Sequence, residues 1–392
     1  MTTDALMNTY GTRAATLVKG EGARLWDADG NEYLDALSGI AVCGLGHSHP
    51  GIAAAVAEQA GTLTHCSNFF DIPNQQKLAD KLRDISGMSN VFFGNSGAEA
   101  NEAAIKMARL FGHKKGIKLP TIVVMDNAFH GRTLATLTAS GSRKVQAGFE
   151  PLVRGFARSP YNDIEALTVI GDNNPNICAV LVEPIQGEGG IHVGDQDYLQ
   201  KLRAVCDQRG WLLMLDEVQT GNGRTGKYFC YQHSGILPDV VTTSKGLGNG
   251  VPIGACLASG EAAELMQPGN HGSTFGGNPL SCAAALAAVT AIADGGLDHR
   301  AAELGDRIMA GFKTELAEVD HVKDIRGMGC MIGIELDRPC KSLFMAAMDK
   351  GLIINVTAES VIRLLPPMIM TDSEADQLVA ILAPLIQDFK TD

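Results

Sequence analysis

The chain of 392 residues lacks the features that distinguish membrane, secreted and nucleic-acid-binding proteins. No apolar run approaches the roughly 20 residues that cross a bilayer. The first residues also lack the basic region and apolar stretch of a secretory signal. Lys and Arg total 32 against 44 Asp and Glu, and this net charge of −12 argues against nucleic acid or an anionic membrane as partner. The nine cysteines form no C-x-x-C pair, which predicts buried, reduced thiols in a cytoplasmic protein.

Helical and extended patterns alternate from about residue 50, in a composition typical of soluble globular proteins, with 45% hydrophobic and 19% charged residues. The helical patterns cover 51–61, 74–85, 97–112 and 196–209. Short apolar strands are expected at 91–93, 121–125, 179–182, 211–215 and 255–258. Such alternation predicts an α/β fold whose mainly parallel sheet is covered by helices on both faces.

The pair Gly295-Gly296 marks the change to a second region. A helix and three strands are expected there, at 300–317, 330–336, 352–356 and 361–365. A capping box that begins at Thr371 starts the last helix. We therefore expect three parts, an N-terminal segment that packs with the small domain, a large domain and a small C-terminal domain, covering 1–48, 49–292 and 293–392.

Lys245 is the most informative single residue. It follows the apolar stretch Ile236–Val241 and opens a loop of small residues that carries no other charge. A lysine at a strand end among small residues can be desolvated, which lowers its pKa and leaves its amine nucleophilic, as a Schiff-base lysine must be. Taken alone, the same pattern also fits a surface charge.

An acidic residue at another strand end supplies the group that such a lysine needs. Asp216 ends the strand 211–215, at the edge where open α/β sheets bind ligands. A pyridoxal-phosphate site requires both a Schiff-base lysine and an acid facing the pyridine nitrogen. Asp216 can provide that acid, and Gln219 could reach the ring hydroxyl. A carboxylate that caps a helix is the alternative.

Two further strand ends carry groups suited to a phosphate and a substrate. After the strand 91–93, the turn at Ser96 and Gly97 opens a helix, whose free backbone N–H groups and positive end attract anions. An ordinary serine N-cap is the alternative. After the strand 121–125, Phe129 can lie flat on a heterocycle and Arg132 can grip a carboxylate with two hydrogen bonds. A core phenylalanine and a solvated arginine are the alternative.

Two patterns point to other kinds of site. The stretch Gly221–Gly226 fits G-x-G-x-x-G, and with Lys227 it nearly gives the nucleotide-binding G-x-x-x-x-G-K-[ST]. Tyr228 stands where the Ser or Thr that binds Mg²⁺ should be, and no helical pattern follows, so a nucleotide-dependent enzyme remains only the rival hypothesis. His47 and His49 could suggest a metal, but no further ligand cluster is apparent near them, and we expect a polar turn and no metal.

Taken together, these segments resemble the class III pyridoxal-phosphate aminotransferases, and the likeness runs nearly end to end. The motifs that carry it are Phe92–Ala100, Phe129–Thr133, Leu215–Gly221 and Ser244–Gly246, and similar stretches are Asn8–Gly11, Val182–Gly190, His271–Pro279 and Ile353–Val356. The resemblance implies a type I transferase fold with a seven-stranded, mainly parallel sheet in the large domain. It also implies a homodimer whose interface completes the site.

For the cofactor, pyridoxal 5'-phosphate, the resemblance implies catalytic roles for Lys245 as the Schiff-base lysine and Asp216 as the pyridinium acid. The whole cofactor-binding set would be Ser96, Gly97, Phe129, Asp216, Glu217, Val218, Gln219, Lys245 and Thr274. Within it, Phe129 would stack on the ring. Thr274 would reach the phosphate across the dimer interface.

For the substrates, the resemblance implies N2-acetylornithine as amino donor and 2-oxoglutarate as acceptor, which becomes glutamate. Arg132 and Ser273 would contact the donor, and Arg363 would hold the α-carboxylate of the acceptor. Glu183 would pair with Arg363 while the donor is bound. Alternative donors are ornithine, succinylornithine, succinyldiaminopimelate and 4-aminobutyrate, and a cofactor-dependent mutase is a further alternative. A substrate contact by Tyr10 stays open.

Overall fold

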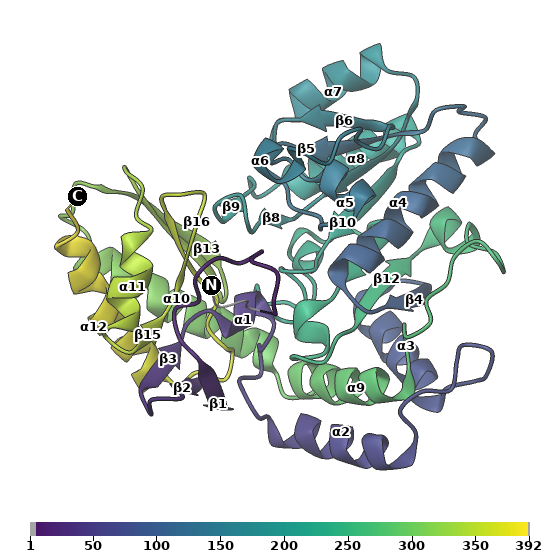
Figure 1. Ribbon diagram of the computed structural model, residues 1–392. Helices are drawn as coiled ribbons and strands as arrows, with labels where there is room; N and C mark the ends of the chain where they lie inside the picture. The colour runs from purple at the N-terminus through teal and green to yellow at the C-terminus, as the bar shows by residue number, and fades with distance from the viewer. Residues whose placement is uncertain (1–4, 391–392) are drawn as a thin grey trace.

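The structure, a computed structural model, describes residues 5–390 and is built around a seven-stranded sheet (Figure 1). The strands lie in the order β4-β12-β11-β10-β7-β5-β6. Their bounds are β4 Asn90–Gly94, β5 Thr121–Met125, β6 Phe156–Ser159, β7 Ile177–Val182, β10 Leu212–Asp216, β11 Val240–Thr243 and β12 Gly254–Ala258. All neighbours are parallel except β12, which is antiparallel to β11 and to β4. The expected seven-stranded, mainly parallel sheet is confirmed.

Helices cover both faces of this sheet because its strands are apolar on both sides. Every residue of β5, β7, β10 and β12 is buried. Alternate residues enter different cores: Leu181 joins the core shared with α4, and Val182 the core shared with α8. The four expected helices are confirmed as α2 (Pro50–Thr62), α3 (Pro73–Ser86), α4 (Gly97–Lys114) and α8 (Tyr198–Arg209).

The N-terminal strands share a sheet with the C-terminal region. The strands β1 (Leu17–Glu21), β2 (Arg24–Asp27) and β3 (Glu32–Asp35) are antiparallel neighbours, and β15 (Leu352–Ile353) pairs with β3 in parallel. This pairing is compatible with an N-terminal segment that packs with the small domain. The boundaries at residues 48 and 292 stay a prediction.

A third sheet, in the order β13-β14-β17-β16, lies in the C-terminal region beside the large sheet (Figure 1). Its strands are β13 (Val322–Met328), β14 (Met331–Leu336), β16 (Asn355–Thr357) and β17 (Val361–Leu364), of which β13 was not expected from the sequence. The helices of this region are α10 (Leu297–Glu315), α11 (Ser342–Met348) and α12 (Asp372–Gln387). The expected capping box is confirmed: Thr371 accepts a hydrogen bond from the Glu374 backbone, and the Glu374 side chain bonds back.

The remaining elements are short or connect these sheets. They are α1 (Ser38–Ala41), α5 (Leu134–Ala139), α6 (Arg143–Gln146), α7 (Ile164–Asn173), α9 (Pro279–Ala293), β8 (Ile185–Gln186), β9 (His192–Val193) and three 3-10 turns, Cys230–Ser234, Lys245–Leu247 and Gly260–Glu264. Within residues 5–390 no single helix is long and apolar enough to cross a membrane; only α9 and α10, bent by 63° at their junction, reach that length together.

Candidate active site

A cavity of about 280 Å³ lies beyond the carboxyl ends of the parallel strands. It is lined by Gly97, Ala98, Asn101, Phe129, His130, Gly131, Arg132, Glu183, Glu188, Asp216, Val218, Gln219, Ser244 and Lys245. Segments that follow β4, β5, β7, β10 and β11 therefore meet at one place, as open α/β sheets arrange their ligand sites. Eight of the residues expected from the sequence come together here: Gly97, Phe129, Arg132, Glu183, Asp216, Val218, Gln219 and Lys245.

Lys245 begins a 3-10 turn, with only Ser244 between it and the end of β11. Its loop is held from behind by Asn222, whose Nδ2 donates to Thr243 Oγ1 at 2.9 Å and to the Ser244 carbonyl at 3.0 Å. Burial lowers the pKa of Lys245 to about 8, although the charges of Glu188 and Asp216 favour the ammonium. The amine is therefore partly neutral, and so nucleophilic, near neutral pH. The glycine stretch 221–226 is buried and supports this loop instead of opening to a nucleotide.

Asp216 is fixed on both carboxylate oxygens. Its Oδ2 accepts hydrogen bonds from His130 Nδ1 and Asn101 Nδ2, both at 2.7 Å, and its Oδ1 accepts from the Val218 backbone at 3.0 Å. A carboxylate only accepts hydrogen bonds, so His130 carries its proton on Nδ1. Apart from its place beside Phe129, nothing in the local sequence indicated a role for His130. Its partner Asp216 becomes apparent only in the folded chain.

Glu217 does not line the cavity, and the expectation that it binds the cofactor stays a prediction. Its fully buried carboxylate accepts hydrogen bonds from the Cys230 and Tyr231 backbones, at 2.8 and 2.9 Å, and from Thr220 Oγ1 at 2.8 Å. Burial raises the pKa of Glu217 to about 7 in spite of these donors. The Glu217 side chain therefore links the end of β10 to the 3-10 turn Cys230–Ser234.

The start of α4 presents a close contact between Gly97 and Val218. A Cβ atom at Gly97 would lie 2.7 Å from Cγ1 of Val218, so only glycine fits at this turn. Ser96 is the N-cap of the helix, and its Oγ accepts a hydrogen bond from the Glu99 backbone at 3.2 Å. The ordinary N-cap is therefore present. Because the helix N-terminus is also open at Gly97, binding of an anion here stays a prediction.

Phe129 and Arg132 form the outer wall of the cavity. The Arg132 guanidinium carbon lies 5.5 Å from the centroid of the Phe129 ring, and the Arg132 side chain is exposed. The Phe129 backbone N–H donates to Glu183 Oε1 at 2.9 Å, which ties the ring to the end of β7. A cationic group thus stands at the mouth of the cavity, where a carboxylate of a substrate could meet it.

The structure does not show the expected pairing of Glu183 with Arg363. Glu183 accepts hydrogen bonds from the Phe129 and Gly187 backbones, at 2.9 and 3.2 Å, and burial raises its pKa to about 7. Arg363, on β17, is 1% exposed and pairs instead with Glu188, Nη1 to Oε1 at 2.5 Å. Its Nη2 donates to Asn355 Oδ1 at 2.8 Å. Burial opposes ionisation of Glu188, but Arg363 outweighs it and lowers the pKa of this carboxyl.

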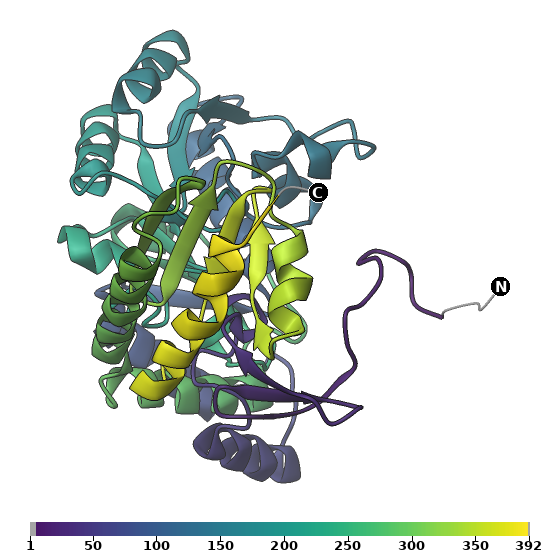
Figure 2. The same cartoon turned by 90° about the vertical axis from the view of Figure 1, so that its left-hand side faces the viewer.

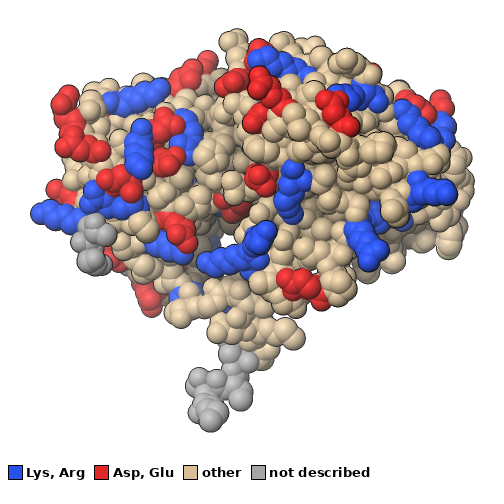
Figure 3. Space-filling view, turned by 90° about the horizontal axis from the view of Figure 1, so that it is seen from above, with Lys and Arg blue, Asp and Glu red and all other residues tan. Residues whose placement is uncertain are grey.

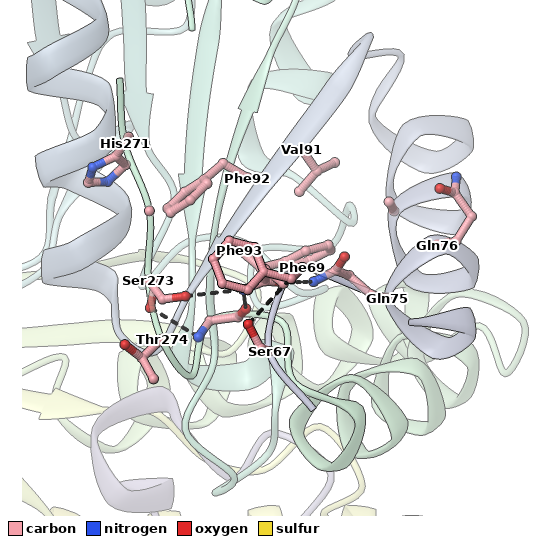
Figure 4. A pocket seen from close by; sticks show the side chains of 14 residues that line it. Ser67, Phe69, Gln75, Gln76, Val91, Phe92, Phe93, His271, Ser273 and Thr274 are labelled. Atoms are coloured by element: carbon pink, nitrogen blue, oxygen red, sulfur yellow. Dashed lines mark hydrogen bonds between the residues drawn. The ribbon is translucent and has the colours of Figure 1, made fainter. Parts of the chain in front are cut away.

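Ser273 and Thr274 lie outside this cavity. They line a separate groove of about 670 Å³, together with Asn68, Phe69 and other residues of α3, β4 and the 271–276 segment (Figure 4). Ser273 Oγ accepts a hydrogen bond from Asn95 Nδ2 at 3.1 Å, so the groove and the Lys245 cavity lie on either side of the turn between β4 and α4. Neither residue lines the Lys245 cavity of its own chain.

Comparison with known proteins identifies the family. The sequence model described as Aminotransferase class-III matches residues 7–386. The chain belongs to the class III aminotransferases. This aminotransferase is 56% identical, over 384 residues and 98% of both chains, to the acetylornithine aminotransferase of Nitrosomonas europaea. It is similar in structure to the ornithine aminotransferase from Toxoplasma gondii, with a TM-score of 0.92, 34% identity, and coverage of 96% of this chain and 91% of that one. The N-acetylornithine aminotransferase from Stenotrophomonas maltophilia matches with a TM-score of 0.85, 35% identity and 97% of both chains.

This aminotransferase is a pyridoxal-phosphate-dependent enzyme, and the residues of its cavity fit that cofactor. The fit rests on a buried acceptor with no partner, since Gln219 Oε1 has no hydrogen bond among residues 5–390. The cavity also joins an amine of lowered pKa, a fixed carboxylate and an aromatic ring, in Lys245, Asp216 and Phe129. These are the partners that the carbonyl carbon, the pyridine nitrogen and the ring of the cofactor require.

Proposed function

We propose that this aminotransferase moves the terminal amino group of N2-acetylornithine to 2-oxoglutarate, reversibly, as a step of arginine biosynthesis in the cytoplasm. The proposal rests on the 56% identity, over nearly the whole of both chains, with a protein named acetylornithine aminotransferase. The expected products are the semialdehyde of the donor and glutamate.

Bound pyridoxal phosphate supplies a carbonyl carbon that an amine can attack and a ring that accepts electrons. We assign to Lys245 the covalent attachment and the transfer of the substrate proton, because burial lowers the pKa of its amine to about 8. Asp216 would hold a proton on the ring nitrogen, and His130 would orient that carboxylate as a positioning residue. Gln219 Oε1 would accept a hydrogen bond from the ring hydroxyl, and the helix N-terminus at Gly97 would bind the phosphate.

We also propose a homodimer in which the partner completes the site. Ser273 and Thr274 line the groove beside β4 and not their own chain's Lys245 cavity, so a second copy would bring them to the phosphate and the donor. The groove exposes Phe69 to 94%. Met7 and Tyr10, each 86% exposed, lie on an N-terminal arm that extends away from the body (Figure 2). Exposed apolar surface of this kind marks protein interfaces.

The Glu188–Arg363 pair gives the site a means to accept two unlike substrates. When 2-oxoglutarate binds, its α-carboxylate would lie beside the reacting carbon and take the guanidinium of Arg363 from Glu188. When acetylornithine binds, no carboxylate lies there, and an unpaired buried arginine would be costly. Glu188 avoids that cost because it already holds Arg363 at 2.5 Å.

Donor preference tests the proposed function. We expect kcat/KM for N2-acetylornithine to exceed that for ornithine by about tenfold or more, because the free α-ammonium of ornithine would lie near Arg132 and repel it. Steady-state rates with acetylornithine, succinylornithine, ornithine and 4-aminobutyrate, each with 2-oxoglutarate, make the comparison. Equal or faster turnover of ornithine or 4-aminobutyrate would overturn the proposed donor. Turnover without any oxo acid would favour a mutase.

The two half-reactions test the role of Glu188. Glu188→Gln should slow the acetylornithine half-reaction more than the 2-oxoglutarate half-reaction, and Arg363→Ala should do the reverse, each by about tenfold or more. Stopped-flow absorbance follows each half-reaction separately. Glu335→Gln is the matched control, because Glu335 pairs with Arg326 at 2.6 Å elsewhere in the C-terminal region. If Glu188→Gln and Arg363→Ala each slow the two half-reactions by the same factor, Glu188 does not exchange Arg363 with the substrate.

A further inference from the structure

A third cavity, of about 440 Å³, lies at the opposite edge of the large sheet from the Lys245 cavity. Three parallel strands begin at its wall: Thr121 starts β5, and Gly155 and Asn176 directly precede β6 and β7. Asp216 and Glu183 stand at the other ends of β10 and β7. The cavity is therefore separated from the catalytic centre by the length of the strands.

The polar side chains at this cavity are rich in hydrogen-bond donors. They are Arg109, His113, Lys118, Arg154, Asn174 and Asn176, with the hydroxyl of Thr121 beside them. Among residues 5–390 no Asp or Glu lines it, although the chain carries 44 acidic residues against 32 Lys and Arg. On the face shown in Figure 3, by contrast, basic and acidic side chains are interspersed. A cavity without acidic residues in an acidic protein selects for negatively charged ligands.

The basic side chains at the cavity keep free hydrogen-bond donors that a ligand could use. Arg109 is held in place, because its Nη2 donates to the Arg154 carbonyl at 2.7 Å. The side chains of Lys118 and Arg154 make no hydrogen bond or ion pair with any residue between 5 and 390. Two neighbouring lysines outside the cavity differ: Lys114 pairs with Glu261 at 3.0 Å, and Lys115 donates to the Gly210 carbonyl at 2.6 Å.

A helix dipole does not account for this arrangement. Arg109 and His113 lie on the last turns of α4, where the negative end of the helix favours cations. Lys118 and Arg154, however, come from two different loops outside any helix, before β5 and before β6. The convergence of groups from α4 and from both loops is the property of a binding site. Leu119, Pro120 and Val153 add an apolar part to its wall.

We propose that this cavity binds a small multivalent oxoanion, with two or more carboxylate or phosphate groups on a short carbon or phosphate frame. The two guanidinium groups can each bind such a group through paired hydrogen bonds, and the ammonium adds a point charge. The site is distinct from the catalytic cavity and does not depend on which amino donor the enzyme uses.

Calorimetric titration of the cofactor-loaded enzyme with citrate and, separately, with pyrophosphate tests the proposal. We expect saturable binding of at least one probe, weakened about tenfold or more in the double variant Lys118→Gln/Arg154→Gln. Tighter binding of citrate would indicate a carboxylate ligand, and tighter binding of pyrophosphate a phosphate ligand. Both replaced side chains are exposed, so unchanged thermal unfolding is expected in the variant.

The matched control is Lys313→Gln/Lys350→Gln, which removes the same charge from exposed positions elsewhere on the chain. It should leave the affinity unchanged. The proposal is overturned if neither probe binds saturably to the parent enzyme. It is also overturned if both double variants bind as the parent does, since binding in the catalytic cavity would give that result.

Discussion

Replacing Lys245 with alanine is expected to lower turnover by about a thousandfold or more, because one amine serves both as the covalent anchor and as the proton carrier. The amine suits both tasks, since burial lowers its pKa to about 8 and leaves a neutral fraction near neutral pH. No second lysine lines the cavity among residues 5–390, so nothing nearby can replace it.

Two measurements check this expectation. In the parent enzyme, borohydride should fix the cofactor to the protein, and Lys245→Ala should lose that fixation together with its turnover. Lys227→Ala is the control, because this exposed lysine follows the glycine stretch 221–226 that imitates a nucleotide-binding loop. It should leave turnover unchanged. Substantial activity in Lys245→Ala, or its loss in Lys227→Ala, would contradict the assignment.

Asp216→Asn is expected to lower turnover by about a hundredfold to a thousandfold, the range seen when a group that stabilises developing charge is removed. The carboxylate would hold a proton on the ring nitrogen, and an uncharged amide cannot. Either orientation of the amide also turns an N–H₂ group toward a donor, because His130 and Asn101 bind one oxygen and the Val218 backbone the other. Cofactor attachment through Lys245 should persist.

Single-turnover kinetics with donor deuterated at the reacting carbon isolate the step. In Asp216→Asn, proton abstraction should be slowed and should show a full isotope effect, while the cofactor content stays near that of the parent. Asp126→Asn is the control. Asp126 is an exposed carboxylate that directly follows β5, a position similar to that of Asp216 at the end of β10. An unchanged rate of proton abstraction in Asp216→Asn would assign the ring nitrogen to another group.

The sequence was informative where function depends on a strand end. Short buried strands of the parallel sheet are continuous apolar runs, so their ends are visible, and the carboxyl ends of parallel strands meet at one edge. Lys245, Asp216 and Phe129 were predicted in this way and line one cavity. The strand β13 was missed because Val322–Met328 mixes charged residues and a glycine with few apolar ones.

Site residues whose positions depend on contacts between distant parts of the sequence could not be predicted in this way. Glu183 and Glu188 stand five residues apart beyond the same strand, and either could have met an arginine from the C-terminal region. Glu183 accepts hydrogen bonds from two backbone N–H groups, so Glu188 is the one that pairs with the arginine. These backbone contacts exist only in the folded loop. Ser273 and Thr274 follow no strand of the large sheet, so nothing local indicated that they lie on the far side of the β4–α4 turn.

The pairing of β3 with β15 has a consequence for synthesis of the chain. Leu34 is made more than 300 residues before its partner Leu352. During synthesis, β1, β2 and β3 can first form only an antiparallel ribbon that lacks β15. The edge of β3 therefore stays unpaired until β15 has emerged. Deleting β15 would leave that edge open and able to pair with another chain.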